Sequence, residues 1–279
     1  MIWMVLVLIL SLISFIMNNY LVWWSIFLLM TIIFLLIMKN SMNFSNMILY
    51  FVLQESMGLL FLLVGLSLLQ FIIILLKTGV APFHFWIFSV MNGMSGMNLL
   101  WFLTFQKFPF LIIMMQLFIM GFIIVIILGI IFCYCQIFLS KNYTNMILLS
   151  STESFNWLLL CGFLSFFNVL YLFMYYIILM IFIIINMQSL SLGDMSWELV
   201  LVFLNMPFMV TFFVKMFSLS SLLLFNNMML LLLLFMMFLS VLSFGFMLVN
   251  MSMNMKLNYQ SKLNSLIFML IPFSMVLLL

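Results

Sequence analysis

Long apolar runs separated by short polar stretches make up the whole chain. The runs are about as long as an α-helix needs to cross the hydrocarbon core of a bilayer, roughly 20 residues. A transmembrane β-barrel would require strict alternation of apolar and polar residues, and the Leu-, Ile-, Phe- and Met-rich runs lack it. We therefore expect an all-α, polytopic membrane protein.

Short polar segments divide the chain into eleven expected transmembrane helices. The separators are rich in Asn, Ser, Gly and Lys, which favour turns and membrane interfaces over helix interiors. The expected helices cover 1–17, 20–38, 46–66, 68–90, 96–118, 119–139, 143–164, 166–187, 197–222, 226–250 and 263–279.

Four loop lysines indicate the orientation of these helices. Lys39, Lys141, Lys256 and Lys262 each follow an even-numbered helix, so all four fall on the face that holds the N-terminus. Because basic loop residues favour the cytoplasmic or matrix side, this face is expected to be the matrix one. An odd number of helices then places the C-terminus in the intermembrane space.

Pro82 lies inside the fourth expected helix and Pro207 inside the ninth. Proline removes a backbone donor and clashes with the carbonyl four residues earlier, so both helices should kink or break. Broken helices at matching places in two halves favour an antiporter-like inverted repeat. On this interpretation residues 1–279 form a single transmembrane domain, made of a five-helix half at 1–118, a second at 119–250, and a C-terminal loop and last helix at 251–279.

Composition adds a genetic and a chemical constraint. Only 4% of the residues are charged, arginine is absent, and the chain has 36 Phe and 32 Met. Those residues have A- and T-rich codons, which points to a gene on an AT-rich mitochondrial genome. Cys133, Cys135 and Cys161 show no metal-binding spacing, so we expect buried structural thiols and no metal site.

Five charged residues fall well inside the expected helices, away from their ends: Lys77, Lys107, Lys215, Glu55 and Glu153. Each costs about 2.5–3.5 kcal/mol at mid-membrane, and such groups usually mark ion or proton paths. The alternative is that a lysine near a helix end extends its amine to the interface. Burial disfavours the charged form of a lysine and a nearby carboxylate favours it, so such pairs can bind and release protons.

The only histidine, His84, follows Pro82 by two residues. It is a candidate for proton relay or for an interior hydrogen bond. The sequence contains no Gly-rich nucleotide loop, phosphate-binding loop or cysteine cluster, so no nucleotide or redox cofactor site is predicted.

Three segments resemble the antiporter-like membrane subunits of respiratory complex I, NADH:ubiquinone oxidoreductase. They are LLKTGVAPFHFWIFSV at 75–90, WFLTFQKFPF at 101–110 and NMPFMVTFFVKM at 205–216, with YFVLQ at 50–54 and LLSSTESFNW at 148–157 in matching order. The resemblance spans the whole chain. It implies a core membrane-arm subunit of a proton-translocating NADH:ubiquinone reductase, in the mitochondrial inner membrane, that provides a proton channel.

The resemblance also implies roles for individual residues. Lys77 matches the channel lysine on the first broken helix, Lys107 the central bridging lysine, and Lys215 the lysine on the second broken helix. NADH, FMN, iron–sulfur clusters and ubiquinone would bind other subunits of the complex. Expected partners are the other membrane-arm subunits, including antiporter-like neighbours and small hydrophobic subunits, and lipids such as cardiolipin; no nucleic acid is expected.

The sequence departs from the family pattern at two acid–base positions. The family glutamate that partners the first lysine is replaced by Leu28, and we expect Glu55 on the neighbouring helix to substitute for it. Ser154, beside Glu153, stands where the family has a histidine. Two other functions fit the same charges: a stand-alone cation/proton antiporter, and a structural membrane subunit with vestigial charges.

Overall fold

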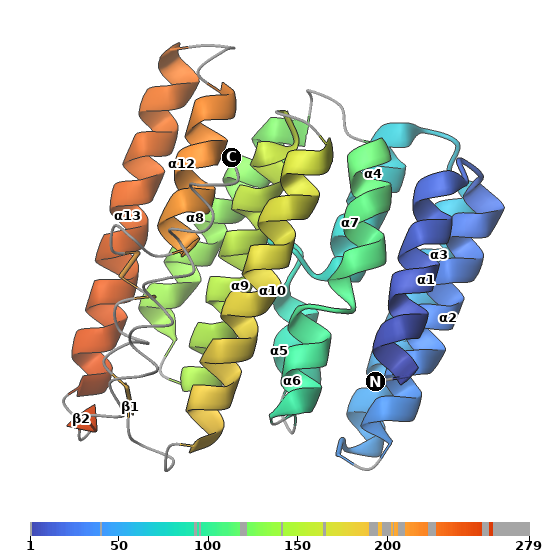
Figure 1. The fold of residues 1–279 in the computed structure, drawn as a ribbon, viewed down its shortest axis with the longest axis horizontal. Coiled ribbons are helices and arrows are strands. Elements are labelled where there is room, and N and C mark those ends of the chain that lie inside the picture. The colour runs from blue at the N-terminus through green and yellow to red at the C-terminus, as the bar shows by residue number, and fades with distance from the viewer. Residues whose placement is uncertain are drawn as a thin grey trace. The chain divides into compact units, whose positions relative to one another are not determined.

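The described part of the chain is almost entirely helical in a computed structural model (Figure 1). It divides into two compact units, Met1–Val125 and Ile126–Leu279, which are treated separately below. The described residues are 2–39, 41–91, 94, 96–117, 122–140, 142–163, 166–189, 195–196, 202, 204–205, 210–222, 227–252 and 257–258.

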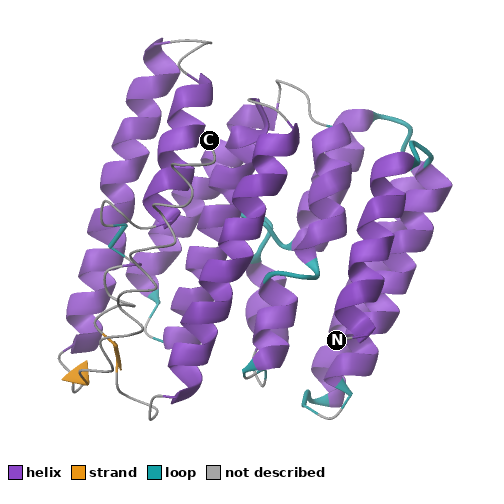
Figure 2. Ribbon diagram, in the orientation of Figure 1, coloured by secondary structure: helices purple, strands orange, loops and turns teal. Residues whose placement is uncertain are grey.

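The first unit is a bundle of long and short helices. Within it α2 packs against α3, α3 against α4, and α1 against α7. Figure 2 shows loops, in teal, that separate α4 from α5 and α6 from α7. The helices are α1 (Ile2–Ile16), α2 (Tyr20–Met38), α3 (Phe44–Leu63), α4 (Ser67–Thr78), α5 (Phe85–Met91), α6 (Met97–Leu103) and α7 (Lys107–Gln116).

In the second unit, α12 packs against α9, α10, α13 and the short helix η2. Two short strands, β1 and β2, pair in parallel with Met195 opposite Leu257. Its elements are α8 (Ile123–Leu139, which begins just before the unit boundary), α9 (Tyr143–Leu160), η2 (Cys161–Phe163), α10 (Phe166–Ser189), β1 (Met195–Ser196), α12 (Val210–Leu222), α13 (Asn227–Ser252) and β2 (Leu257–Asn258).

Several helices are long and apolar enough to cross a membrane, as a multi-pass protein requires. Within the described ranges there are five candidate spans, at Tyr20–Met38, Phe44–Leu63, Met97–Gln116 (α6 and α7 with the turn between them), Phe166–Ile185 and Leu230–Asn250. Shorter apolar helices cover Trp3–Ile16, Ser67–Thr78, Ile123–Leu139 and Thr211–Ser220. The expected last helix at 263–279 and the loop lysines Lys141, Lys256 and Lys262 lie outside the described residues.

The expected helix at 68–90 is interrupted, since α4 ends at Thr78 and α5 begins at Phe85. Gly79 adopts a left-handed φ of 61°, its N–H donates to the Leu76 carbonyl, and the Val80 N–H donates to the Leu75 carbonyl. This pair of bonds is the Schellman ending of a helix. Lys77 therefore lies in the last turn of α4, where a cation interacts favourably with the helix dipole.

Backbone groups exposed by this interruption are satisfied by side chains, as the interior of a membrane protein requires. The indole Nε1 of Trp86 donates to the Leu76 carbonyl at 3.0 Å. The amide Nε2 of Gln54, on α3, donates to the carbonyl of Lys77 at 2.8 Å. Helices α3 and α5 thus fix the end of α4 that carries Lys77.

A second interruption, between α6 and α7, was not expected within 96–118. Residues 104–106 form a turn, and Lys107 becomes the first residue of α7. Pro109 explains the position, because its ring would clash with the carbonyl of Phe105 in a continuous helix but is tolerated in a first turn. The Gln106 N–H instead donates to the Trp101 carbonyl, and the Lys107 N–H to that of Thr104.

The expectation of three buried thiols was wrong for one residue. Cys133 and Cys161 are buried, whereas Cys135 is exposed. Residues two apart on a helix point in nearly opposite directions, so Cys133 and Cys135 cannot both face the interior of the unit.

Candidate functional site

All three lysines predicted inside the apolar helices are buried within the protein. Lys77 and Lys107 are each 3% exposed and Lys215 is 2% exposed, whereas Lys39, at the end of α2, is exposed. None of the three extends its amine to the surface of its unit. Their burial makes snorkelling a poor description of these side chains, so each requires a polar or aromatic partner.

Lys77 reaches from α4 toward α2 and α3. Its ammonium lies 4.4 Å from the centre of the Phe27 ring, within the range of a cation–π contact. It also lies against the backbone of α3, because a Cβ atom at Gly58 would be only 3.3 Å from the Lys77 Nζ. The face of the Phe27 ring and the absence of a side chain at Gly58 together leave room for the Lys77 ammonium.

Glu55 lies on α3 one turn before Gly58 and interacts electrostatically with Lys77. The two are not joined by a direct ion pair in the part of the chain that the structure describes. Glu55 is instead bonded to the buried Thr31 of α2, whose hydroxyl donates to the carboxylate at 2.9 Å. Thr31 is one turn from Leu28, where the family glutamate would lie.

Lys77 and Lys107 line one small cavity with Thr78, Gln106 and Phe110. Its volume of about 10 Å³ is close to what one water molecule needs. Gln106 also donates to the hydroxyl of Tyr50 on α3. The first unit therefore brings two of the predicted lysines together around a polar space.

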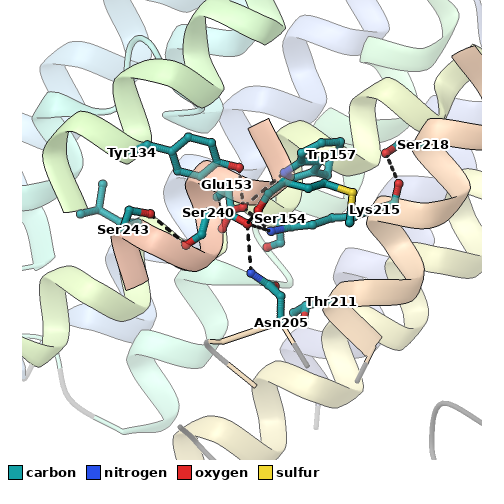
Figure 3. Close-up of polar contacts among 12 residues, drawn as sticks. Tyr134, Glu153, Ser154, Trp157, Asn205, Thr211, Lys215, Ser218, Ser240 and Ser243 are labelled. Atoms are coloured by element: carbon teal, nitrogen blue, oxygen red, sulfur yellow. Dashed lines mark hydrogen bonds and ion pairs between the residues drawn. The ribbon is translucent and has the colours of Figure 1, made fainter. Parts of the chain in front are cut away.

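Lys215, on α12, forms an ion pair with Glu153 on α9, with 2.6 Å between Nζ and Oε1 (Figure 3). The same carboxylate oxygen accepts from the Tyr134 hydroxyl of α8 at 2.9 Å and from the Trp157 indole of α9 at 3.2 Å. The Lys215 ammonium is also 5.6 Å from the centre of the Trp157 ring. A buried pair of this kind is maintained only when further hydrogen bonds satisfy it, as they do here.

A serine on α13 completes the surroundings of Lys215. The Lys215 ammonium donates to Ser240 Oγ at 3.0 Å, and the Asn205 amide donates to the same oxygen at 3.3 Å. The Ser240 hydroxyl donates in turn to the Met237 carbonyl at 2.6 Å. Its one proton and both lone pairs are thus used, so Ser240 is a fixed acceptor for Lys215.

A cavity of about 30 Å³ adjoins the Glu153–Lys215 pair. Polar side chains from three helices and from Asn205 line it together with apolar ones such as Trp157, Val214 and Phe244. Its polar lining comes from Ser150, Glu153, Ser154, Tyr176, Asn205, Thr211 and Lys215.

Two further predicted residues, Pro82 and His84, belong to the junction between α4 and α5. Pro82 lies in the non-helical segment between α4 and α5. His84 is fully buried at the start of α5, and its ring centre is 5.2 Å from that of Phe85 and 5.7 Å from that of Phe88. Pro207 lies outside the described residues, so the predicted interruption of the second proline-containing helix stays a prediction.

Sequence reasoning did not identify the neutral polar residues that serve the charged ones. Thr31, Tyr134 and Ser240 were overlooked because each is one polar residue within an otherwise apolar run. A usable signal was present, since polar side chains inside membrane helices usually face the protein interior.

Comparison with known proteins gives two close relatives, although no family model matches the chain. The NADH-ubiquinone oxidoreductase chain 2 of Caenorhabditis elegans is 50% identical over 90% of this chain and 92% of its own length. The protein of the same name from Ascaris suum is 47% identical over 89% of this chain and 83% of its own length. With this identity over nearly its full length, the chain belongs to the NADH-ubiquinone oxidoreductase chain 2 family.

Proposed function

We propose that this subunit of NADH-ubiquinone oxidoreductase conducts protons across the mitochondrial inner membrane through its buried lysines and glutamates. The observation that carries the proposal is that Lys77, Lys107 and Lys215 are buried inside a membrane protein. Lys77 and Lys107 line a shared cavity, and Lys215 is paired with a carboxylate. Buried charges in a bilayer are costly, and a passive scaffold would have no use for them.

Each unit supplies one carboxylate and at least one lysine to this path. In the first unit, Glu55 acts on Lys77, and the shared cavity gives Lys77 access to Lys107. In the second unit, Glu153 and Lys215 are in direct contact. A proton bound by one lysine changes the charge that its neighbours experience, so that protonation of one group favours release from the next.

The proposal also covers the topology of the chain in the membrane and its partners. Eleven transmembrane helices in two five-helix halves would place the N-terminus in the matrix and the C-terminus in the intermembrane space. Helices α4 and α5 would be two parts of one interrupted transmembrane helix. NADH, FMN, iron–sulfur clusters and ubiquinone would bind other subunits, and membrane-arm neighbours and cardiolipin would contact this chain. Labels that reach both termini from one side of the membrane would contradict this orientation.

The proposal is tested by replacing Lys77, Lys107 and Lys215 one at a time with Met in the intact complex, reconstituted in sealed vesicles. Proton uptake per NADH oxidised should fall strongly for each variant, because Met is an unbranched side chain only one atom shorter than Lys and cannot bind a proton. Lys39→Met provides the matched control, since Lys39 is exposed at the end of α2.

Two outcomes would overturn the proposal in favour of a different function. Normal assembly with normal proton yield in all three variants would indicate a structural subunit with vestigial charges. Sodium–proton exchange by the chain alone, without partner subunits, would indicate a stand-alone antiporter.

A further inference from the structure

One oxygen atom of Glu153 accepts from three donors on three helices. Lys215 on α12, Tyr134 on α8 and Trp157 on α9 all direct a hydrogen toward Oε1, at 2.6, 2.9 and 3.2 Å (Figure 3). We propose that Tyr134 and Trp157 are positioning residues that hold Glu153 as a carboxylate and Lys215 as an ammonium. This inference rests on the proposed proton-conducting function and identifies what controls Lys215, the lysine of the second unit.

The chemistry of the acceptor supports this assignment. A carboxylate oxygen accepts several hydrogen bonds, whereas the hydroxyl oxygen of a protonated carboxyl carries its own hydrogen and accepts poorly. Proton transfer within the pair would break one N–H bond of Lys215 and form an O–H bond at Oε1. The Tyr134 and Trp157 hydrogens would then point at a hydroxyl, so both bonds oppose the transfer.

The two donors differ in how firmly they are fixed. Trp157 is fully buried one turn after Glu153 on the same helix, so the direction of its indole N–H is set by the position of the ring. Tyr134 comes from a different helix, and its hydroxyl hydrogen can rotate about the C–O bond. Movement of α8 relative to α9, or rotation of that hydroxyl, would therefore release the Lys215 proton to Glu153.

Other titratable groups surround this pair and could contribute to its pH dependence. Cys133 on α8 lies 3.3 Å from the Thr152 hydroxyl, and Cys161 of η2 donates to the Val214 carbonyl at 3.6 Å. Tyr176 on α10 lines the same cavity as Glu153 and Lys215. Of these neutral groups, Tyr134 donates a hydrogen bond to the Glu153 carboxylate.

Tyr134→Phe tests the proposal, because it removes the hydroxyl and keeps the ring. In the intact, reconstituted complex, the decline of proton pumping toward acidic pH should begin at a higher pH than in the parent protein, since the Glu153 carboxylate loses a hydrogen-bond donor. Tyr171→Phe is the matched control. Tyr171 also loses a hydroxyl bond, 2.9 Å to Tyr175, but on α10 and away from Glu153.

An infrared difference spectrum gives a second readout that does not depend on pumping. The carbonyl band of a protonated carboxyl, assigned to Glu153 by its loss in Glu153→Gln, should increase at fixed pH in Tyr134→Phe. Trp157→Phe removes the other donor to the same oxygen and should shift the pH profile in the same direction. It keeps the proposal testable even if Tyr134→Phe yields too little complex.

The possible outcomes separate this inference from the proposed function. If Lys215→Met abolishes pumping while Tyr134→Phe and Trp157→Phe keep the profile of Tyr171→Phe, the positioning role is overturned and the proton path stands. If Lys215→Met and Glu153→Gln both pump normally, the proton path through this pair is overturned instead. A matching shift in both donor variants, with an unshifted control, supports the inference.

Discussion

The ammonium nitrogen of Lys77 lies directly over Gly58, at 3.3 Å from the point where a Cβ atom would be. Gly58 is on α3 one turn beyond Glu55, so the absent side chain lets a lysine from α4 approach the helix that carries the carboxylate. Glycine inside a helix costs roughly 0.5–1 kcal/mol relative to alanine. The contact with Lys77 gives a physical reason for a glycine at this position.

Gly58→Ala should therefore impair proton pumping without destabilising the protein. The new methyl group would improve helix propensity, but it would displace the Lys77 ammonium by a few tenths of an ångström and move it relative to Glu55 and Phe27. Because small misplacements of a reacting group reduce rates severalfold or more, we expect a severalfold loss of coupled turnover at normal complex abundance.

Gly65→Ala is the control for this change. A Cβ atom at Gly65 meets nothing within 4 Å, so its effect is confined to the backbone. Equal pumping by the Gly58 and Gly65 variants, measured as proton uptake per NADH oxidised in vesicles, would show that Lys77 needs no space at Gly58.

Thr31 should matter as a support for Glu55. Its hydroxyl has one hydrogen and two acceptors within reach, the Leu28 carbonyl at 2.7 Å and the Glu55 carboxylate at 2.9 Å. An ionised Glu55 is the better acceptor, and a hydrogen bond to a charged group is worth about 1.5–3 kcal/mol. Thr31→Val keeps the shape and removes the hydroxyl, so proton uptake per NADH oxidised should fall several-fold.

Two variants make the Thr31 test specific. Thr31→Ser retains the hydroxyl and should pump normally. Ser25→Ala, on the same helix, removes a hydroxyl that is exposed and donates to the Val22 carbonyl at 2.7 Å. A loss of activity in Ser25→Ala as large as that in Thr31→Val would mean that the bond to Glu55 has no special role.

Local signals in the sequence predicted the positions of many helices well. The helix expected at 20–38 has those bounds in the structure, because Asn19 caps its start and polar residues follow its end. The interruption around Pro82 could also be predicted from the sequence, since proline cannot continue a helix and Gly79 supplies the left-handed residue that ends one. The turn before Lys107 was not predicted, because Pro109 clashes with the carbonyl four residues before it and so interrupts the helix upstream of its own position.

Contacts between helices could not be predicted from the sequence in the same way. Glu153 and Lys215 were both recognised as buried charges, yet their ion pair depends on which faces of α9 and α12 meet. In a soluble helix an apolar stripe marks the inner face, but membrane helices are apolar on every side and carry no such stripe. The donor Tyr134 and the acceptor Ser240 come from two further helices, so no spacing along the chain joins them to Lys215.

Gly79 should be irreplaceable for assembly, because two separate constraints meet at this residue. Its φ of 61° is a left-handed conformation that costs other residues about 1–3 kcal/mol. A Cβ atom would in addition be 1.9 Å from Cδ1 and 2.4 Å from Cγ1 of the buried Ile87 on α5. Gly79→Ala should therefore displace α5 from the end of α4, break the bond from Trp86 to the Leu76 carbonyl, and strongly reduce the amount of assembled complex in the membrane.

Gly79→Asn separates the two constraints, since asparagine tolerates the left-handed conformation better than alanine but still carries a Cβ atom. We expect Gly79→Asn to assemble almost as poorly as Gly79→Ala, because the clash with Ile87 is the same in both. Gly65→Ala should assemble normally. Complex abundance on native gels and its thermal stability provide the measurements. Full recovery in Gly79→Asn would show that backbone strain alone requires glycine here, and wild-type assembly of Gly79→Ala would contradict the close packing of α5 against the end of α4.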